Sequence, residues 1–549
     1  MFYRLYSFDM LKKTSIFALY FAKILQVVMY QCFQRIFLFF FFLPVSLTLS
    51  AKIVTVSISD ADRWSYGDMM AYSGDTVRFE SPMFVMNNYY SDRLIIAPRR
   101  IYSPTNQFLP GSDEMLELQS LNSKAQVTLY GVSEYHRMAE RISGLTVKVI
   151  ASNQWQFISA DGWTGTREDL MVPPSVDGDS IHNLLVCIWN LEYYLVENFG
   201  TGFGPENQAQ HNEQRTKILK ALRQINADIY GFCEIEQGQS ALRELADSLG
   251  SNYTFINDGG TPFSSYVKVG YVYDSTKVEP VGPLQNNNTG VSQRKKMITF
   301  REKSSGESFI FSLNHFKAKG SGGTGLDADQ HDGQGGFNAS RVAESKSVIE
   351  MYNTYSRLVG ESDILIAGDL NSYAKEDPIT TFTDRGYIDL HQAFHADSSY
   401  SYSYHGVLGY LDHALANRSM ARQVTGMSAW HINSPEHNMF HYEDPTVTDL
   451  SMFRASDHDP ILVGLRLCSQ NTQVKDVVLD NVSVLYDAAQ PVLHGAEGGY
   501  CRIYNVSGVL IDAGYIDSDY YTLPDLQGGF YIVDVFLNSV RTQFKLILK

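Results

Sequence analysis

Two short polar segments carry the residue types best suited to chemistry. Gly368-Asp369-Leu370-Asn371 follows an apolar run at 364–367 that is typical of a buried strand, and Ser456-Asp457-His458-Asp459-Pro460 precedes the apolar run at 461–463. Asp369 and Asn371 are two apart at a strand end and so point to the same side. Asp457 offers a metal ligand beside a proton acceptor, His458. Together they indicate metal-assisted phosphodiester cleavage, which needs hard oxygen ligands, a base and a phosphate clamp.

Four further strand ends carry polar, metal-capable residues. They are Trp189-Asn190-Leu191-Glu192, Cys233-Glu234-Ile235-Glu236, Leu313-Asn314-His315-Phe316-Lys317 and Tyr410-Leu411-Asp412-His413. Each segment alone is a weak signal, because an Asp after a strand usually caps a helix or begins a turn. Six such ends in one region are a stronger signal, since ligands of layered α/β folds gather at one edge of the sheet.

The elements that must position these residues lie between 183 and 468. Apolar runs predict buried strands at 184–189, 229–233, 267–273, 309–313, 364–367 and 410–416, and helical spacing predicts helices at 214–225, 241–249 and 338–355. Buried strands with helices between them predict a layered α/β domain. The glycine-rich stretch 320–336 is expected to be a loop at the site.

Two β-rich regions flank this domain. Residues 52–179 alternate in short apolar segments without a long helical period, which predicts a small all-β module, with an oligonucleotide-binding-type barrel as the leading candidate. A linker is expected at 173–178. Residues 475–549 return to alternating segments and predict a small β-sandwich tail.

Length, composition and charge limit the number of domains and the kinds of partner that the chain can have. Its 549 residues are too many for one core, and 44% hydrophobic with 19% charged residues is ordinary for a folded protein. The formal charge of −16 excludes a bulk basic footprint for nucleic acid. A phosphate substrate is not excluded, because bound divalent cations can invert the field of an acidic site. The sequence does not indicate an oligomeric state.

The N-terminus carries the pattern of an export signal. Arg35 precedes an apolar run at 36–49, and the small residues Ser50 and Ala51 follow it. We therefore expect residues 1–51 to be a signal region, with Met29 as the true start, and no stable membrane span after its removal. The protein would then be extracellular, on the cell surface or periplasmic. A retained membrane anchor is the alternative.

The cysteines do not form a disulfide framework. Five are present, without an even, closely spaced set. Cys187 and Cys233 both lie in apolar runs, and we expect two buried thiols on neighbouring strands rather than a disulfide.

The middle domain resembles the endonuclease/exonuclease/phosphatase superfamily, and within it the secreted bacterial extracellular nucleases. Besides the strand ends above, the matching text includes Asp332-Gly333-Gln334-Gly335-Gly336-Phe337-Asn338-Ala339-Ser340-Arg341 and Ser372-Tyr373-Ala374-Lys375-Glu376-Asp377-Pro378. The motifs occur in family order, and an oligonucleotide-binding-type domain often comes first in that nuclease group. The resemblance implies a four-layer αββα sandwich with the site at one rim, acting on nucleic acid, with DNA as the expected polymer.

The resemblance also implies roles for individual residues. Glu234, helped by Asn190 and Asp457, would bind Mg²⁺, with Mn²⁺ or Ca²⁺ as alternatives. His458 would be the general base or a phosphate-facing imidazole, oriented by Asp412. Asp369 would position or deprotonate the attacking water with Asn371 beside it, and His315 would donate to a phosphate oxygen. These roles suit the chemistry of each side chain.

The chain departs from the nuclease pattern in two places. Cysteines that often flank the 332–335 loop are replaced by Gly or Thr, so this loop is expected to be less tightly tied, or held by metal or packing alone. The carboxylate that pairs with the phosphate-binding His in pancreatic deoxyribonuclease has no match near 268–271, which leaves the partner of His315 unassigned.

The tail resembles another known group. Its segments 503–508 and 529–533 are similar to the C-terminal sorting domains of type IX secretion, which implies a secretion-machinery partner. A generic β-sandwich appendage is the alternative.

Three functions follow for the whole chain. The leading one is a secreted, metal-dependent nuclease. The first alternative is a phosphatase or phosphodiesterase of the same superfamily that acts on small or lipid phosphoesters. The second is a catalytically inactive surface-binding protein. Lys317, Lys319 and Arg341 are candidates for phosphate contacts, or else solvated surface charges.

Overall fold

The computed structural model describes residues 53–548, apart from 91, 179, 260–265, 287–293, 445–446, 469–482, 488–489, 506–507, 525 and 538–539. The predicted signal region at 1–51, with Met29, lies outside the described residues. Within the described ranges, no helix combines the length and the apolar character of a membrane span.

The middle domain is built on two six-stranded sheets, in the orders β12-β13-β11-β10-β23-β22 and β14-β15-β16-β17-β21-β18. The strands of the first sheet are β10 (Leu184–Tyr194), β11 (Ile229–Glu236), β12 (Tyr253–Phe255), β13 (Val267–Asp274), β22 (Val424–Ala429) and β23 (Ile461–Leu465). Those of the second are β14 (Val278–Asn286), β15 (Lys295–Glu302), β16 (Ser308–His315), β17 (Ile364–Asp369), β18 (Ile388–Asp389) and β21 (Asp412–Ala416).

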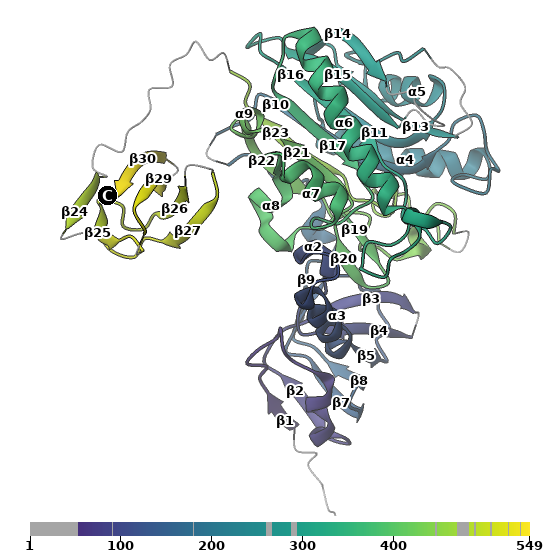
Figure 1. Ribbon diagram of the computed structural model, residues 1–549. Helices are drawn as coiled ribbons and strands as arrows, with labels where there is room; N and C mark the ends of the chain where they lie inside the picture. The colour runs from purple at the N-terminus through teal and green to yellow at the C-terminus, as the bar shows by residue number, and fades with distance from the viewer. Residues whose placement is uncertain are drawn as a thin grey trace, which may run out of the picture. The chain divides into compact units, whose positions relative to one another are not determined.

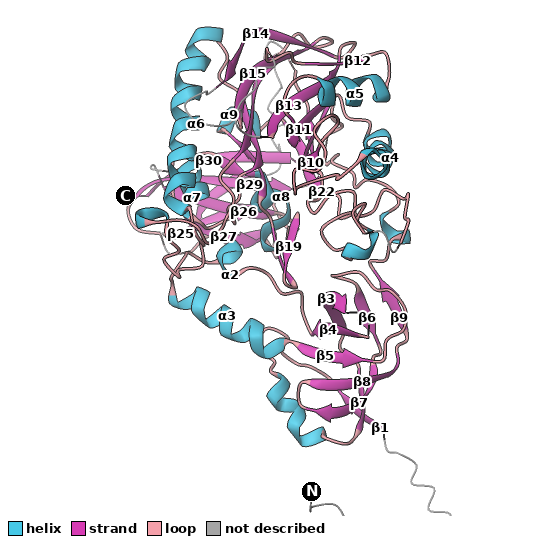
Figure 2. Cartoon of the chain, turned by 90° about the vertical axis from the view of Figure 1, so that its right-hand side faces the viewer, coloured by secondary structure: helices cyan, strands magenta, loops and turns pink. Residues whose placement is uncertain are grey.

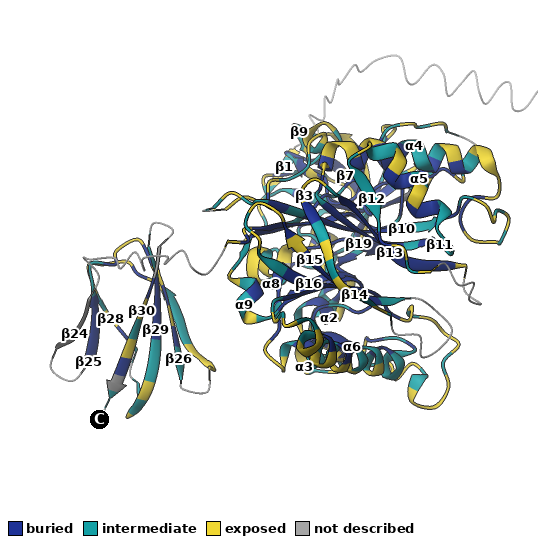
Figure 3. Ribbon diagram, turned by 90° about the horizontal axis from the view of Figure 1, so that it is seen from above, coloured by how far each residue is buried: buried dark blue, intermediate teal, exposed yellow. Residues whose placement is uncertain are grey.

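Helices cover the outer faces of both sheets. They are α4 (Gln208–Ile225) and α5 (Ser240–Leu249) on the first sheet and α6 (Asn338–Val359) and α7 (Asp377–Thr383) on the second. The short helices α8 (Leu390–His395) and α9 (Arg418–Ala421) instead contribute Leu390 and Met420 to the core between the sheets. The remaining elements are the 3₁₀ turns η3 (Gly325–Asp327), η4 (Ala396–Ser398) and η5 (Asn438–Phe440) and the short hairpin of β19 (Tyr402–Tyr404) and β20 (Val407–Gly409). Figure 3 shows the dark-blue buried strands between α4 and α5 on one side and α6 on the other.

Alternation along the strands explains the layering. In β10, Val186 and Ile188 join the core between the sheets, whereas Cys187 and Trp189 join the core beneath α4 and α5. Strands buried on both faces read as continuous apolar runs, which is why the sequence pattern located them. The predicted four-layer αββα sandwich is confirmed (Figure 1). Cys187 and Cys233 are buried free thiols, as predicted.

The N-terminal module contains a single nine-stranded sheet in the order β1-β2-β7-β8-β5-β4-β3-β6-β9. Its elements are β1 (Ile53–Val56), η1 (Tyr66–Tyr72), β2 (Thr76–Phe79), β3 (Met83–Tyr90), β4 (Arg93–Ala97), α2 (Pro104–Gln107), α3 (Asp113–Ala125), β5 (Val127–Tyr130), β6 (Arg141–Ser143), β7 (Thr146–Ala151), β8 (Gln154–Ser159), β9 (Gly162–Thr164) and η2 (Glu168–Leu170).

The β-rich character of this module is confirmed, although the sequence pattern did not predict its helical elements, of which α3 is the longest. Helix α3 lies alongside the sheet (Figure 2) and starts at Ser112, whose hydroxyl accepts a hydrogen bond from the Met115 amide at 3.2 Å. The nine strands exceed the five of a simple oligonucleotide-binding-type barrel. That assignment, like the domain boundaries given above, stays a prediction.

The C-terminal tail forms two sheets, β24-β25-β28 and β27-β26-β29-β30. Its strands are β24 (Ser483–Asp487), β25 (Gln490–His494), β26 (Tyr500–Asn505), β27 (Leu510–Tyr515), β28 (Tyr520–Thr522), β29 (Gly529–Leu537) and β30 (Val540–Leu548). Side chains from both sheets, including Leu493 and Val533, share one core. This arrangement agrees with the predicted β-sandwich.

Candidate active site

Three neighbouring strands of the second sheet place predicted site residues in one row. Parallel pairing of β16 with β17 sets His315 opposite Asp369, and antiparallel pairing of β17 with β21 sets Asp369 opposite Asp412. Gly368 permits this close approach: its φ is +128°, and a Cβ there would lie 1.9 Å from the Asn314 carbonyl oxygen. The Gly-Asp motif is therefore required by backbone packing as well as by chemistry.

The first sheet supplies Asn190 and Glu234 from two irregular strand ends. The pairing of β10 with β11 shifts register after Asn190, and the pairing of β11 with β13 shifts around Glu234, whose φ is +57°. Such bulges re-aim side chains beside active sites. Asn190 Nδ2 donates to Asp369 Oδ2 at 3.0 Å and so connects the two sheets, while the Tyr193 amide donates to Glu234 Oε2 at 3.2 Å.

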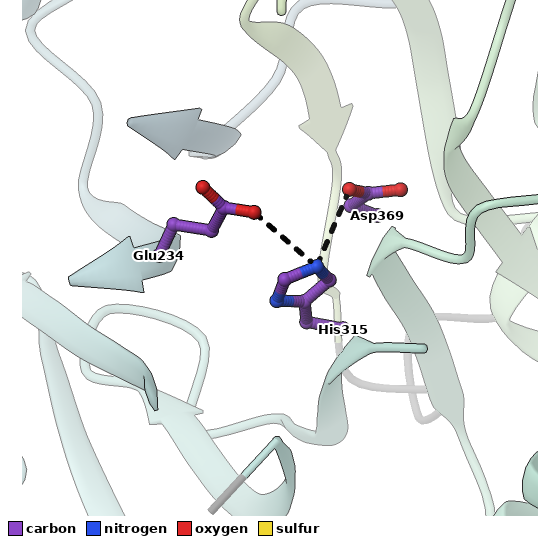
Figure 4. A group of neighbouring side chains, drawn as sticks. All are labelled: Glu234, His315 and Asp369. Carbon is purple, nitrogen blue, oxygen red and sulfur yellow. Dashed lines mark ion pairs between the residues drawn. The ribbon is translucent and has the colours of Figure 1, made fainter. Parts of the chain in front are cut away.

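His315 points between two carboxylates (Figure 4). Its Nε2 lies 3.5 Å from Glu234 Oε1 and 3.6 Å from Asp369 Oδ2. The carboxylates of Glu234 and Asp369 are therefore the partners of His315 that the sequence left unassigned. Burial, and then the nearby Arg294, hold the pKa of His315 well below its usual range. His315 is therefore a neutral imidazole near pH 7, able to donate one hydrogen bond rather than carry a charge.

His458 and Asp412 form a buried pair. His458 Nδ1 lies 2.7 Å from Asp412 Oδ2, which also accepts a hydrogen bond from the Ser401 hydroxyl at 2.6 Å. Burial alone would lower the pKa of His458, but the carboxylates of Asp412, Asp457 and Asp369 together raise it well above its usual range. An imidazolium that donates to a phosphate oxygen or to a leaving group fits this environment better than a free base.

Asp369 is the centre of the polar network. Its Oδ1 accepts the Asn371 amide at 2.9 Å, and its Oδ2 accepts Nδ2 of Asn371 at 3.2 Å. The His458 Nε2 atom lies 3.9 Å from the same Oδ2. Burial raises the pKa of Asp369 to about 6, although His458 lowers it. A carboxylate with a pKa near neutrality suits transfer of a proton from water.

Three carboxylates converge without enough positive charge to balance them. Burial, followed by the charges of Asp457 and Asp369, raises the pKa of Glu234 to about 8. Burial and the charge of Glu192 raise the pKa of Asp457. A divalent cation would relieve this repulsion, so the residues fit the predicted metal.

Two residue groups have ligand atoms close enough together for one ion. They are Glu234 with His315 and Asp369, and Asp369 with Asp412 and His458. Mg²⁺ prefers oxygen, so in the first group the carboxylate of Glu234, rather than the imidazole of His315, is the expected ligand. The predicted ligand Asn190 uses its Oδ1 to accept the Glu192 amide at 3.0 Å, which leaves that oxygen one lone pair for a metal.

Two of the three predicted phosphate-contacting cations have structural roles instead. Arg341 is fully buried, and its guanidinium donates to the carbonyl oxygens of Gly336 and Gln334 at 2.8 and 2.9 Å. Lys319 pairs with the buried Glu376 at 2.5 Å and donates to the same Gln334 carbonyl. Lys317 is exposed, with its Nζ 4.5 Å from the centroid of the Phe337 ring, and remains a candidate.

The same contacts correct the expectation for the 332–335 loop. Gln334 receives hydrogen bonds on its carbonyl from Lys319 and Arg341, and its side chain bonds both Asp332 and Asp377. Hydrogen bonds therefore hold the loop, and one of the donors, Lys319, is itself fixed by its ion pair with Glu376. The loop is thus not held by metal or packing alone, whereas the expectation that it is less tightly tied than a loop with flanking cysteines stays a prediction.

Several residues at the site had no role in the sequence reasoning. Ser401 orients Asp412, and the ring of Tyr402 lies 4.8 Å from that of His458. His441 Nε2 pairs with Glu192 Oε2 at 3.0 Å. Glu192 was named at the strand end that carries Asn190, but no role was assigned to it. Ser401 and Tyr402 give no signal in sequence, because they reach the site only through tertiary packing.

Comparison with known proteins agrees with this geometry. Residues 187–458 match the model of the Endonuclease/Exonuclease/phosphatase family. No curated protein matches the chain.

Solved structures with similar folds include three that span about half of this chain. An endonuclease/exonuclease/phosphatase from Bacteroides vulgatus is 16% identical, covering 52% of this chain and 98% of its own, with a TM-score of 0.36. A mannosyl-6-phosphatase from Bacteroides thetaiotaomicron is 16% identical (52% and 100%, TM-score 0.37), and D. rerio TDP2 complexed with single strand DNA product is 13% identical (52% and 99%, TM-score 0.35). The match of residues 187–458 to the family model places the middle domain of this chain in the Endonuclease/Exonuclease/phosphatase family, whose members hydrolyse phosphoester bonds.

Proposed function

We propose that this chain is an exported, metal-dependent nuclease that hydrolyses phosphodiester bonds of nucleic acid, with DNA as its substrate. The observation that carries the hydrolytic part is the row of His315, Asp369 and Asp412 with His458 paired to Asp412 at 2.7 Å. These side chains provide a water-activating carboxylate, a neutral hydrogen-bond donor and an oriented imidazole within one rim.

Each residue has a role in this proposal. Glu234 and Asp457, with Asn190, would hold Mg²⁺, which when bound stabilises the charge that develops on the phosphate. Asp369 accepts a proton from the attacking water, and Asn371 fixes that carboxylate. His315 donates to a non-bridging oxygen. His458, held by Asp412, donates a hydrogen bond or a proton toward the ester oxygens.

Aromatic side chains beside the site support a nucleic acid substrate. The Tyr193 ring stacks on Phe203, with centroids 5.1 Å apart and planes inclined by 17°. Phe203 is 58% exposed, and the backbone amide of Tyr193 touches Glu234. An exposed ring beside a phosphate site, such as that of Phe203, is a surface on which unpaired bases stack in nucleic-acid proteins, because every base has a π-face.

Incubation with supercoiled plasmid DNA and Mg²⁺ tests this proposal. We expect nicked and linear products, and no cleavage in EDTA. The Phe203→Ala variant should bind DNA more weakly but hydrolyse bis(p-nitrophenyl) phosphate at an unchanged rate. Release of inorganic phosphate from a sugar phosphate without plasmid cleavage would assign the chain to the phosphatases. Absence of turnover on every ester, with DNA binding intact, would favour the inactive surface-binding protein.

Export belongs to the same proposal. It is supported by the Arg35 and 36–49 pattern and by the C-terminal segments that resemble sorting domains. N-terminal sequencing of the protein recovered from culture medium should give a residue near Lys52. Recovery of the uncleaved chain in the membrane fraction would refute signal removal.

A further inference from the structure

The 431–436 segment of the middle domain is bonded directly to the chain at His458 and Asp459. Asn433 Nδ2 donates to the His458 carbonyl oxygen at 2.8 Å. Asp459 Oδ1 accepts the amides of Asn433 and Ser434 at 2.8 and 2.9 Å, and Asp459 Oδ2 accepts the Ser434 hydroxyl at 2.7 Å. The position of the His458 imidazole therefore depends on where this segment lies.

The same segment is bonded to the N-terminal module through Arg137. Its Nη2 donates to the carbonyl oxygen of His431, the first residue of the segment, and its Nε donates to Oε1 of Glu436, the last one, at 2.7 Å. One planar guanidinium thus joins both ends of the segment, with a geometry that the ammonium of a lysine does not reproduce. The third nitrogen, Nη1, donates to the Gly165 carbonyl oxygen of the module at 3.3 Å and so fixes the guanidinium.

These contacts belong to a buried interface. The Arg137 side chain is 2% exposed and that of Glu436 is 0% exposed. The Met138 amide donates to the Pro435 carbonyl oxygen at 2.9 Å. Apolar side chains of the module and of the middle domain share one buried cluster, which contains Met86, Ala97, Ile101, Ala125, Met138, Ala139, Tyr400 and Leu408. Breaking a buried ion pair leaves an uncompensated charge, so the Arg137 contacts are expected to persist in solution.

A second route leads from the module to the same imidazole through the hairpin β19–β20. The Leu408 carbonyl oxygen of β20 accepts a hydrogen bond from the Ser103 amide at 2.8 Å. Ser401, which precedes β19, donates to Asp412 at 2.6 Å, and Asp412 Oδ2 lies 2.7 Å from His458 Nδ1. The module therefore contacts the elements that hold both the backbone and the side chain of His458.

We propose that the N-terminal module supports the active site, with Arg137 as a positioning residue for His458. Arg137 acts through the 431–436 segment, and all three of its guanidinium nitrogens are bonded within the protein. The module then contributes to the rate of hydrolysis, whereas a domain that only binds a strand contributes to affinity. This inference rests on the proposed function only in that hydrolysis takes place at His458.

The variant Arg137→Lys in the full chain tests the positioning role. Lysine keeps the positive charge beside Glu436, but its single ammonium does not hold both ends of the 431–436 segment. The substrate is bis(p-nitrophenyl) phosphate with Mg²⁺, a small ester that needs no strand-binding surface. We expect kcat to fall at least about fivefold and KM to change less than about twofold, because a small misplacement of a group at the reacting centre lowers the rate strongly.

Arg167→Lys is the matched control. Arg167 is also bonded to the Glu436 carboxylate, at 2.6 and 2.8 Å, but its third donor reaches Asp449 at 3.0 Å and not the start of the segment. The change should therefore lower kcat by less than about twofold, since the geometry around the imidazole is kept. Circular dichroism and urea unfolding of both variants show how far each is destabilised.

A second pair of variants tests the hairpin route and applies even if Arg137→Lys does not fold. Ile101 and Ile96 are both 0% exposed, but Ile101 belongs to the cluster that contains Leu408, whereas Ile96 belongs to the core of the module itself. Ile101→Val and Ile96→Val each remove one methylene and are expected to fold. The first should lower kcat at least about twofold and the second should leave it unchanged, because only the first allows the hairpin to shift.

Hydrogen exchange followed by mass spectrometry gives a readout that needs no turnover. The Ala455 amide, close to His458 in the chain, is bonded to Asn433 Oδ1 at 2.9 Å. A peptide that covers residues 455–461 should exchange about tenfold faster in Arg137→Lys than in the wild type, because local opening costs less once the segment is loosened. In Arg167→Lys its exchange should be unchanged.

The outcomes separate this inference from the nuclease proposal. Wild-type kcat for the small ester in a folded Arg137→Lys overturns the positioning role, and so does a raised KM for plasmid DNA as the only effect. If that variant does not fold, wild-type kcat in Ile101→Val overturns the support by the module. An equal loss of kcat in Arg137→Lys and Arg167→Lys also overturns it, since the loss then follows from stability alone.

Plasmid cleavage by the wild type still supports the nuclease in each of these cases. If the wild type hydrolyses no ester, the nuclease proposal fails, and the exchange of 455–461 alone decides whether Arg137 positions His458. Faster exchange in Arg137→Lys only then supports the positioning role, and equal exchange in all three proteins refutes it.

Discussion

Replacing Asp412 by Asn should separate the role of its charge from that of its shape. Asp412 lies opposite Asp369 in the β17–β21 register, and its Oδ2 is 2.7 Å from Nδ1 of His458. Asn keeps the volume of the side chain and the hydrogen bond from Ser401. It removes the anion that stabilises the His458 imidazolium and raises its pKa.

The size of the effect follows from the loss of the charge-assisted bond to His458, which the neutral Asn replaces at most by a weaker one. A hydrogen bond to a charged group contributes about 1.5–3 kcal/mol. At 1.36 kcal/mol for each tenfold in rate, its loss lowers kcat by about 10- to 150-fold if the bond is fully used in the transition state. The high-pH limb of the kcat profile, where His458 loses its proton, should also move to lower pH. The reason is that burial lowers the pKa of His458 and fewer carboxylates then oppose it.

The assay is kcat against pH for plasmid nicking and for bis(p-nitrophenyl) phosphate, with circular dichroism to verify the fold. Ser401→Ala is the matched control, since it removes the 2.6 Å hydrogen bond to Asp412 but keeps the charge. We expect a loss of about fivefold in the control, from a bond that contributes about 1 kcal/mol. A folded Asp412→Asn enzyme with wild-type kcat and an unmoved pH profile would refute the orienting role of Asp412.

Three further predictions concern metal binding, acid stability and the N-terminal module. Glu234→Gln should weaken Mn²⁺ binding at least tenfold by calorimetry, whereas Glu244→Gln, away from the site, should not; equal affinities would remove Glu234 as a ligand. Burial lowers the pKa of His391 to about 3. In the unfolded chain the His391 side chain binds a proton below about pH 6.5, whereas in the folded chain it stays neutral. The free energy of unfolding should therefore be fully retained above that pH and fall by about 2 kcal/mol at pH 5, as measured by urea unfolding. His391→Gln should make this free energy less dependent on pH. Arg137→Met should lower the free energy of unfolding by about 3 kcal/mol, because the Glu436 carboxylate, which is 0% exposed, loses one of its cationic partners. An unchanged midpoint of urea unfolding would contradict this.

Hydrophobic runs predicted six of the twelve strands in the two sheets of the middle domain. The strands at 184–189 and 364–367 were found because both of their faces are buried, so the apolar signal is continuous. The helix at 338–355 was found by its period and extends to Val359. Helix α3 was not found, because only Met115, Asn122 and Ala125 of its 13 residues are buried and its apolar signal is weak. The Ser112 cap with acidic residues after it was the available signal.

The candidate site was predictable in its members but not in its connections. The eight predicted residues lie on strand ends or loops that the two sheets bring to one rim, because strand order places β16, β17 and β21 side by side. The sequence alone does not show which lysine and arginine side chains near the motifs remain free to contact a phosphate. Lys319 and Arg341 are close to the motifs, yet their donors are used by Glu376 and by carbonyl oxygens. That choice depends on where the 332–335 loop folds.

The backbone itself carries information that the residue pattern lacks. Glu192, Tyr193, Glu234 and Asn371 all have φ between 50° and 57°, a region that costs non-glycine residues about 1–3 kcal/mol each. Glu234 and Asn371 are predicted to act on the metal or the phosphate, and Glu192 and Tyr193 follow Asn190 on the same strand. A regular strand would alternate these side chains between the core and α4. The irregular turns instead direct Glu234 toward His315 and Asp369, so the rigid sandwich, with buried strands on both sides of the rim, bears the strain that assembles the site.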